Sequence, residues 1–128
     1  MEFVAATPPG YRPDEDVVRI AREAGGTVEL VDDPRAAVEG ADVLYTDVWT
    51  SMGQEEEREQ RLEDLAGFGI DADLVKQAGD GAVVLHCLPA HYGEEITEQV
   101  LYGPQSAVWD QAENRLHAQK ALMALVIR

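Results

Sequence analysis

The sequence predicts an α/β domain, built as a doubly wound, Rossmann-like parallel sheet of about five strands with helices on both faces. Two observations lead to this prediction. Short apolar runs typical of buried strands alternate with segments whose apolar residues recur at helical spacing. In addition, the chain has 128 residues, which is enough to bury a core within one domain. Strands separated by helices pair in parallel, and the helices then cover the sheet.

Five short apolar runs are the predicted strands. They are residues 2–8, 27–33, 42–49, 82–89 and 106–110. The first run is stopped by Pro8 and Pro9, and the fourth by Pro89, because proline lacks the N–H that a strand ladder needs.

Five segments between and after these runs are the predicted helices. They are residues 13–26, 34–41, 71–79, 94–103 and 112–128. The first has an acidic first turn and a glycine stop, the second starts with Pro34, and the third is capped by Asp71. The last is amphipathic. Residues 55–69 fit either a charged, solvent-exposed helix or an extended loop.

The composition limits the functions that are possible. The chain carries 25 acidic and 10 basic residues, and its net charge of −15 repels phosphate backbones and anionic lipid. We therefore expect no nucleic-acid or membrane partner. The single cysteine forms no internal disulfide, the apolar runs are shorter than the roughly 20 residues of a membrane span, and no charged-then-apolar leader opens the chain. These features predict a cytoplasmic protein.

The candidate site lies in the loops after the third, fourth and fifth predicted strands, because ligands of an open parallel sheet bind beyond the carboxyl ends of its strands. These loops contain TDVWTSMGQE, HCLPAH and DQAENR. In the first loop, Asp47 either holds an amine by charge-assisted hydrogen bonding or caps the following turn. Ser51, Met52 and Gly53 either offer a hydroxyl, backbone donors and space for a ligand, or form an ordinary turn.

The second loop contains the only cysteine, Cys87, at the end of an apolar run. A lone cysteine in a strand usually fills the core, but its place at the carboxyl end favours a thiol presented to a ligand. Pro89 ends the strand and leaves the Leu88 carbonyl available. His86 and Cys87 point to opposite faces, and no other Cys/His cluster has ligand spacing, so no metal site is expected.

Arg115 lies near the start of the last predicted helix, where a guanidinium suits a phosphate or a carbonyl oxygen. The alternative is an ordinary ion pair with Glu113 or Asp110. His91 and His117 are expected at the surface or as caps. The chain contains no glycine-rich nucleotide loop and no Ser/His/Asp order of an esterase, so neither chemistry is expected.

Three stretches, in this order, resemble one family. DVWTSMGQE (47–55), HCLPAHYGEEIT (86–97) and VWDQAENRLHAQKALM (108–123) are similar to the carboxyl-terminal, ornithine-binding domain of ornithine carbamoyltransferases. The resemblance extends from ATPPGY (6–11) to the last helix, so residues 1–128 are expected to be this domain. It implies transfer of a carbamoyl group from carbamoyl phosphate to the δ-amino group of L-ornithine, giving L-citrulline and phosphate in arginine metabolism. It also implies no metal or organic cofactor.

The resemblance implies roles on the ornithine side of this reaction. Asp47 holds the ornithine amine, and Ser51 and Met52 bind the amino-acid end. Cys87 positions or deprotonates the δ-amino group. The chemistry agrees with these roles, because an ammonium attacks only after losing a proton, which Asp47 and a Cys87 thiolate are suited to manage.

On the carbamoyl side, the resemblance implies contacts from the Leu88 carbonyl and from Arg115, whose charge stabilises the developing oxyanion. No STRT-type or HPxQ-type segment for the phosphate occurs in the 128 residues. The chain alone is therefore expected to be inactive without an amino-terminal carbamoyl-phosphate domain. Tyr92 departs from the pattern, since a basic residue is expected there in many relatives.

The closing helix packs toward the amino-terminal domain in the resembled fold. Here its apolar face is expected to lack that partner, which predicts self-association or a changed helix position. This face includes Leu116, Ala121, Leu122 and Leu125. The family also implies a homo-oligomer, a trimer for the full-length enzyme. Two alternatives stay open: a module that binds ornithine or a related amino acid without turnover, and a carbamoyltransferase for a related amine such as putrescine.

Overall fold

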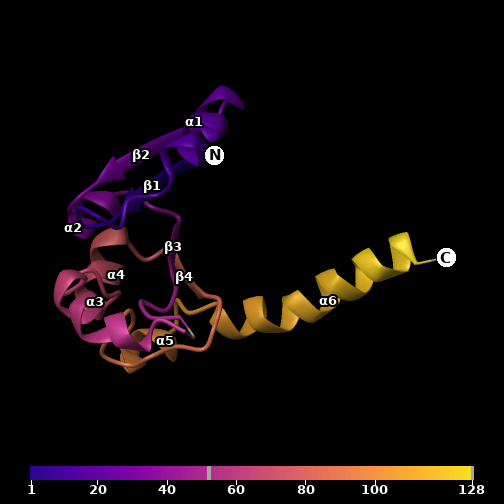
Figure 1. Ribbon diagram of the computed structural model, residues 1–128. Coiled ribbons are helices and arrows are strands. Elements are labelled where there is room, and N and C mark those ends of the chain that lie inside the picture. The colour runs from indigo at the N-terminus through magenta and orange to yellow at the C-terminus, as the bar shows by residue number, and fades with distance from the viewer. Residues whose placement is uncertain (52, 128) are drawn as a thin grey trace.

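Parallel strands alternate with helices in this computed structural model, which describes residues 1–51 and 53–127 (Figure 1). The strands are β1 (Glu2–Ala6), β2 (Thr27–Val31), β3 (Val43–Thr46) and β4 (Val83–His86). The helices are α1 (Glu15–Glu23), α2 (Pro34–Ala37), α3 (Arg58–Asp64), α4 (Ala72–Ala78), α5 (Glu98–Leu101) and α6 (Val108–Val126), with a 3-10 turn η1 (Glu55–Glu57) before α3. The α/β class is therefore confirmed.

Polar side chains begin the helices at the places that the sequence indicates. Asp14 accepts hydrogen bonds from two backbone N–H groups of the first turn of α1. Asp71 caps α4 by accepting from the Leu74 N–H at 2.7 Å, as predicted, and Pro34 occupies the first turn of α2. Of the two options for residues 55–69, the helix is confirmed by η1 and α3.

The strands form two separate parallel pairs among the described residues, β1 with β2 and β3 with β4. The prediction of parallel pairing is confirmed, whereas the count of about five strands is not. In Figure 1, β1 and β2 lie with α1 at one end of the body, and β3 and β4 lie beside α3, α4 and α5.

The predicted strand at residues 106–110 is wrong. Only Ser106 pairs with Val84, through a single parallel bridge. The Val84 N–H donates to the Gln105 carbonyl, and the Ala107 N–H donates to the Val84 carbonyl. The chain then turns directly into α6, because Gln111 N–H closes the first helical turn on the Ala107 carbonyl. A short apolar run thus contributes one bridge to the sheet and continues as a helix.

One apolar core fills the space between the β3–β4 pair and helices α4 and α5. Val84, Ile96 and Val108 are fully buried at its centre. Residues of the closing segment therefore contribute to the core only up to the start of α6. The other buried members of the cluster are Val38, Leu44, Ile70, Leu74, Val75, Ala82, Val100 and Leu101.

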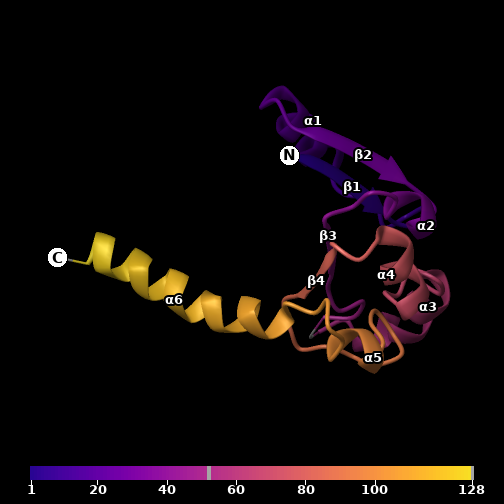
Figure 2. The ribbon, with the colours of Figure 1, turned by 180° about the vertical axis from the view of Figure 1, so that it is seen from behind.

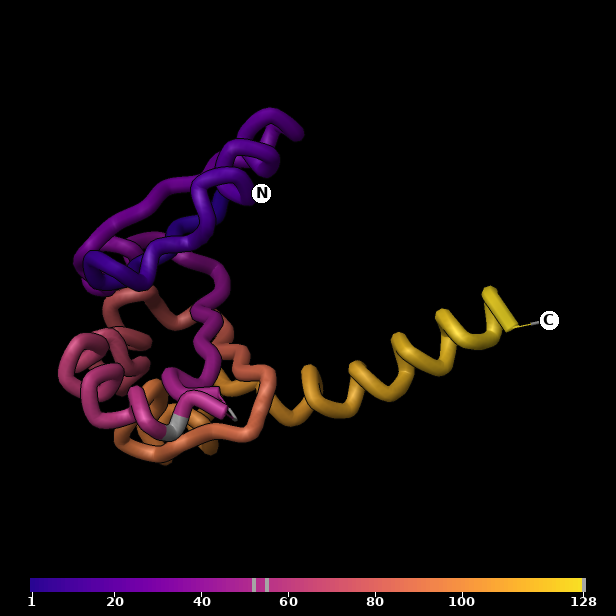
Figure 3. The backbone as a smooth tube through the Cα atoms, viewed as in Figure 1, coloured from indigo at the N-terminus to yellow at the C-terminus, as the bar shows by residue number. Residues whose placement is uncertain are grey.

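Helix α6 leaves this body and extends away from it, as Figures 2 and 3 both show. Of its described residues only Val108 is buried. The apolar side chains of α6 are exposed within this chain, since Leu116 is 58% exposed and Leu125 is 80% exposed. Among the described residues, no helix has the length and apolar character to cross a bilayer.

Candidate functional site

Asp47 and Cys87 meet at the carboxyl ends of β3 and β4. Thr46 pairs in register with His86, so the next residue of each strand leaves the ladder beside the other. The Cys87 Sγ donates a hydrogen bond to Asp47 Oδ1 at 2.8 Å, although 40 positions separate them. The first two predicted loops therefore converge, with a carboxylate and the only thiol of the chain in contact.

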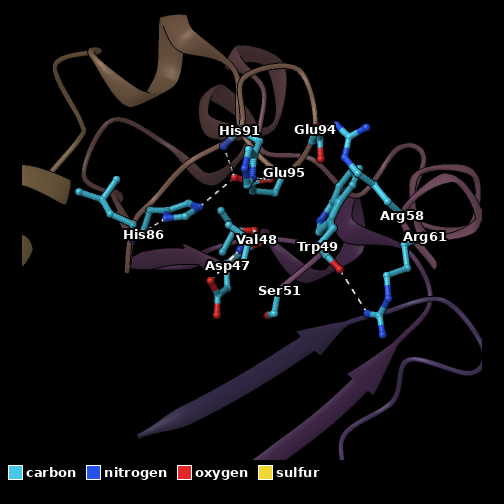
Figure 4. Close-up of polar contacts among 12 residues, drawn as sticks. Asp47, Val48, Trp49, Ser51, Arg58, Arg61, His86, His91, Glu94 and Glu95 are labelled. Atoms are coloured by element: carbon cyan, nitrogen blue, oxygen red, sulfur yellow. Dashed lines mark hydrogen bonds and ion pairs between the residues drawn. The ribbon is translucent and has the colours of Figure 1, made fainter. Parts of the chain in front are cut away.

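Asp47 takes the capping role considered for it, while its role in holding an amine stays a prediction. Its Oδ1 accepts the Val48 N–H at 2.7 Å, which caps the turn after β3, and also faces the Cys87 thiol. The side chain is exposed, so the carboxylate is open to a ligand. Figure 4 shows Asp47 beside Val48 and apart from the buried Glu95.

The Cys87 thiol is half-buried, and its surroundings favour the protonated form. Burial raises the pKa of Cys87, and the hydrogen bond to Asp47 and the charge of that carboxylate raise it further. The Cys87 thiolate considered from the sequence stays a prediction, and these surroundings disfavour it in the absence of substrate. The thiol points its proton at the Asp47 carboxylate.

Behind the thiol lies a fully buried pair, His86 and Glu95. The His86 Nδ1 accepts the Leu88 N–H at 2.8 Å, so the ring proton sits on Nε2, which donates to Glu95 Oε1 at 3.1 Å (Figure 4). Glu95 Oε1 also accepts the His91 N–H at 2.6 Å. Sequence reasoning missed this pair, because Glu95 follows β4 by nine positions and reaches His86 only when the loop folds back.

The backbone turns sharply after Cys87. Leu88 has φ 58°, and it is the one non-glycine residue with a positive φ in the described part of the chain. This left-handed conformation is costly for leucine, and it is held here by the bond to His86 and by packing against the core. The Leu88–Pro89 peptide is cis. A residue kept in such an unfavourable backbone conformation at the end of a strand is typical of a functional loop.

Ser51 lies in the turn after β3, on the side of the site away from the core. Its side chain is exposed, its N–H donates to Gln54 Oε1 and its carbonyl accepts the Gln54 N–H. Arg61 of α3 donates to the Trp49 carbonyl at 3.2 Å and so ties the loop to the body (Figure 4). Met52, the other predicted residue of this loop, lies outside the described residues.

Arg115 lies on α6, one helical turn beyond Gln111, and its side chain is exposed. Within residues 1–51 and 53–127 its guanidinium makes no hydrogen bond or ion pair, so the alternative of a salt bridge to Glu113 or Asp110 is not seen. The structure therefore does not bring Arg115 to Cys87.

Gln111 anchors the first turn of α6 on the strand ends. Its Oε1 accepts the His86 N–H at 3.1 Å and its Nε2 donates to the Tyr45 hydroxyl at 3.2 Å. Gln111 was missed, although it lies in the third candidate loop. The sequence feature that could have indicated its role is a polar side chain placed directly after the last apolar run, residues 106–110.

Tyr92 contacts Tyr102, the residue that follows α5. Its hydroxyl lies 3.1 Å from that of Tyr102, and the ring of Tyr102 is 5.5 Å from that of Trp109. The hydrogen bond to Tyr102 raises the pKa of Tyr92, and desolvation adds to this effect. The residue that departs from the family pattern thus joins an exposed aromatic row.

Comparison with known proteins finds relatives that cover almost the whole chain. An ornithine carbamoyltransferase of Methanoculleus marisnigri is 61% identical over 127 residues, which are 99% of this chain and 41% of that protein. The solved ornithine carbamoyltransferase of Pyrococcus furiosus has a TM-score of 0.86 and 56% identity, over 97% of this chain and 41% of that one. The enzyme of Gloeobacter violaceus has a TM-score of 0.85 and 45% identity, over 100% and 43%.

The chain therefore spans about two fifths of the length of these relatives. The family model for the Asp/Orn-binding domain of aspartate/ornithine carbamoyltransferases matches residues 1–126. This match covers almost the whole chain and includes the convergent loops at the ends of β3 and β4. The chain belongs to the aspartate/ornithine carbamoyltransferase family, as its Asp/Orn-binding domain.

Proposed function

We propose that residues 1–128 are the ornithine-binding domain of an ornithine carbamoyltransferase. One observation carries the proposal: Cys87 and Asp47 lie in contact at 2.8 Å, at the strand ends of a domain whose relatives bear that name. The reaction transfers the carbamoyl group of carbamoyl phosphate to the δ-amino group of L-ornithine. It gives L-citrulline and phosphate, in cytoplasmic arginine metabolism.

Asp47 is proposed to bind the δ-ammonium group of ornithine. Its carboxylate is exposed and gives a charge-assisted hydrogen bond to a cationic amine. The net charge of −15 also attracts a substrate whose side chain is cationic. Ser51 and Met52 are proposed to bind the amino-acid end of the same molecule.

Cys87 is proposed to manage the proton that the δ-nitrogen must lose before it attacks. As the thiol proton moves to Asp47, the sulfur takes up the proton of the amine. The nitrogen then forms a bond to the carbamoyl carbon while the bond from that carbon to the phosphate oxygen breaks. Phosphate leaves with the electron pair and takes up the second proton that the nitrogen loses, which leaves one N–H on that nitrogen in citrulline. Holding the two substrates in line supplies much of the rate.

Leu88 and Arg115 are proposed to contact the carbamoyl moiety, Leu88 through its carbonyl and Arg115 through its guanidinium. The sharp turn at Leu88 supports the first contact. For the second, α6 has to pack closer to the strand ends than it does in this structure. We propose that an amino-terminal carbamoyl-phosphate domain provides the surface for this packing, within the homo-oligomer, a trimer, that the family resemblance implies.

A citrulline assay tests this function. The chain is incubated with ornithine and carbamoyl phosphate, first alone and then with the separately produced amino-terminal domain of a relative that is shown to bind it. The proposal expects citrulline only in the mixture, and none with Cys87→Ala. Ornithine binding without citrulline in an assembled mixture would support a non-catalytic binding module, and a higher rate with putrescine would support the other alternative.

A further inference from the structure

The loop after β4 carries a cluster that the proposed reaction does not use. His91, Glu94 and Glu95 each offer one ligand atom, and these atoms all lie within 4.8 Å of one another. Figure 4 shows His91 beside Glu95, and Glu94 next to Arg58. One histidine and two carboxylates within five residues do not form a Cys/His ligand pattern, so the sequence alone did not predict this cluster.

The strongest sign of a missing partner is one oxygen of Glu95. The Glu95 side chain is 0% exposed, and Oε1 already accepts from His86 and from the His91 N–H. Oε2 is buried as well, yet it has no hydrogen-bond partner among residues 1–51 and 53–127. The His91 Nδ1 lies 3.9 Å from it, which is too far for a hydrogen bond. A buried carboxylate oxygen without a partner costs free energy and points to a group that binds there.

We propose that His91, Glu94 and Glu95 bind a divalent metal ion of the zinc class. One imidazole nitrogen and two carboxylate oxygens are ligands that Zn²⁺ accepts, and the two carboxylates balance its charge. Ligand atoms lie about 2.0 to 2.2 Å from such an ion, so the cluster has to close slightly around it. The His91 side chain is 47% exposed, which leaves it free to make this movement.

Two further features fit a bound ion. Arg58 pairs with Glu94 through Oε1, and a carboxylate has acceptor capacity for a guanidinium and a metal ion together. Glu94 also lines a hollow of about 530 Å³, bordered by Trp49 and Asp71, so this ligand is open to solvent on one side. Three protein ligands leave the fourth position of a tetrahedral ion to water.

The ion would also stabilise the position of the loop that begins at Cys87, after β4. Glu95 would bind the metal through Oε2 while its Oε1 keeps the hydrogen bond to His86. Since Cys87 follows His86 directly, the ion would hold the backbone next to the thiol in place. Metal binding at this cluster does not depend on the proposed carbamoyl transfer, so each can fail without the other.

Calorimetric titration of the full chain with Zn²⁺ alone tests the site, with Co²⁺ absorption as a second readout. We expect one ion per chain and a Co²⁺ spectrum without a sulfur-to-metal band. His91→Ala should weaken affinity about tenfold or more. His117→Ala is the matched control, because His117 sits 3.4 Å from Glu113 on exposed α6 and should leave affinity unchanged. Cys87→Ser should also leave it unchanged.

Three results would overturn the proposal: no Zn²⁺ binding by the unmodified chain, equal affinity in His91→Ala, or loss of binding in Cys87→Ser. Circular dichroism of the metal-free variants shows whether each one is folded. If His91→Ala does not fold, His91→Gln provides the same comparison, since its amide nitrogen and oxygen bind Zn²⁺ far more weakly than imidazole.

Discussion

The Nε2 atom of His86 lies 3.1 Å from Oε1 of Glu95, and both side chains are fully buried. Since Cys87 follows His86 directly, this pair fixes the chain where the thiol leaves the sheet. The Leu88 N–H on the other ring nitrogen sets the tautomer and the direction of the next turn. The apolar core thus ends in a polar anchor, and the proposed site lies on the outer side of that anchor.

Replacing Glu95 should therefore destabilise the domain. Glu95→Ala leaves the His86 Nε2–H and the His91 N–H without their acceptor, which costs about 2 kcal/mol in the free energy of unfolding. Glu95→Gln keeps an acceptor oxygen and should cost less. Urea unfolding in a chelating buffer measures both, with exposed Glu39→Ala as the control. An equal stability of Glu95→Ala and Glu39→Ala would contradict the anchor.

Alkylation of Cys87 should respond to Asp47. The chain has one thiol, so the rate with iodoacetamide reports on it alone. Burial and Asp47 both raise the pKa of Cys87, so the alkylation midpoint should lie above that of free cysteine. Asp47→Asn removes the charge that disfavours the thiolate, lowers this pKa and speeds alkylation at neutral pH. Asp42→Asn, at the opposite end of β3, should change nothing; equal profiles for both variants would contradict the contact.

The same shift predicts how stability depends on pH. A thiol whose pKa is raised by folding favours the folded state below the pKa of the unfolded chain, and this contribution is lost as pH rises through the raised value. The free energy of unfolding should therefore fall in the alkaline range, and Cys87→Ser should flatten part of that fall. Urea titrations at several alkaline pH values measure the difference, and identical slopes for both proteins would speak against a raised pKa.

Gln111 should act as a positioning residue for α6. Gln111→Ala removes the bonds to the His86 N–H and the Tyr45 hydroxyl and should cost about 1 kcal/mol for each in stability. In the mixture that forms citrulline, kcat should fall more than the KM for ornithine changes, since Gln111 orients the helix that carries Arg115. Exposed Gln99→Ala is the matched control. A change confined to stability, with kcat intact, would assign Gln111 a structural role only.

The exposed face of α6 should cause self-association of the chain by itself. Leu122 is 60% exposed and Met123 is 48% exposed, and apolar side chains gathered on one helix favour contact with another copy. Light scattering should show a mass that rises with concentration, and Leu122→Glu should lower it. Gln119→Glu adds the same charge on α6 without removing apolar surface and should have a smaller effect. A monomer at all concentrations would refute this prediction.

Local sequence patterns predict the site residues that lie at the ends of strands. Pro89 and the apolar run before it placed Cys87 at the carboxyl end of β4, and Asp47 followed β3 in the same way. The contact between them could not be predicted from the residues alone, because the register of β3 against β4 is a property of the folded sheet.

Other features depend on long-range packing that no local pattern contains. Val108 and Trp109 have strand-forming side chains, yet they begin α6 because their backbone bonds continue along the helix. Glu95 is buried because His86 and the His91 N–H satisfy one of its oxygens. Helix α6, which carries Arg115, extends away from the body instead of packing on the strand ends.

The rate of citrulline formation in the assembled mixture, measured for the unmodified chain, Asp47→Asn and Asp42→Asn, tests the central claim most directly. If the Asp47 carboxylate binds the amine and receives the thiol proton, Asp47→Asn should lower the rate about a hundredfold or more. Asp42→Asn, an exposed aspartate on the other end of the same strand, should retain the full rate. Retention of most of the activity by Asp47→Asn would contradict the proposed site.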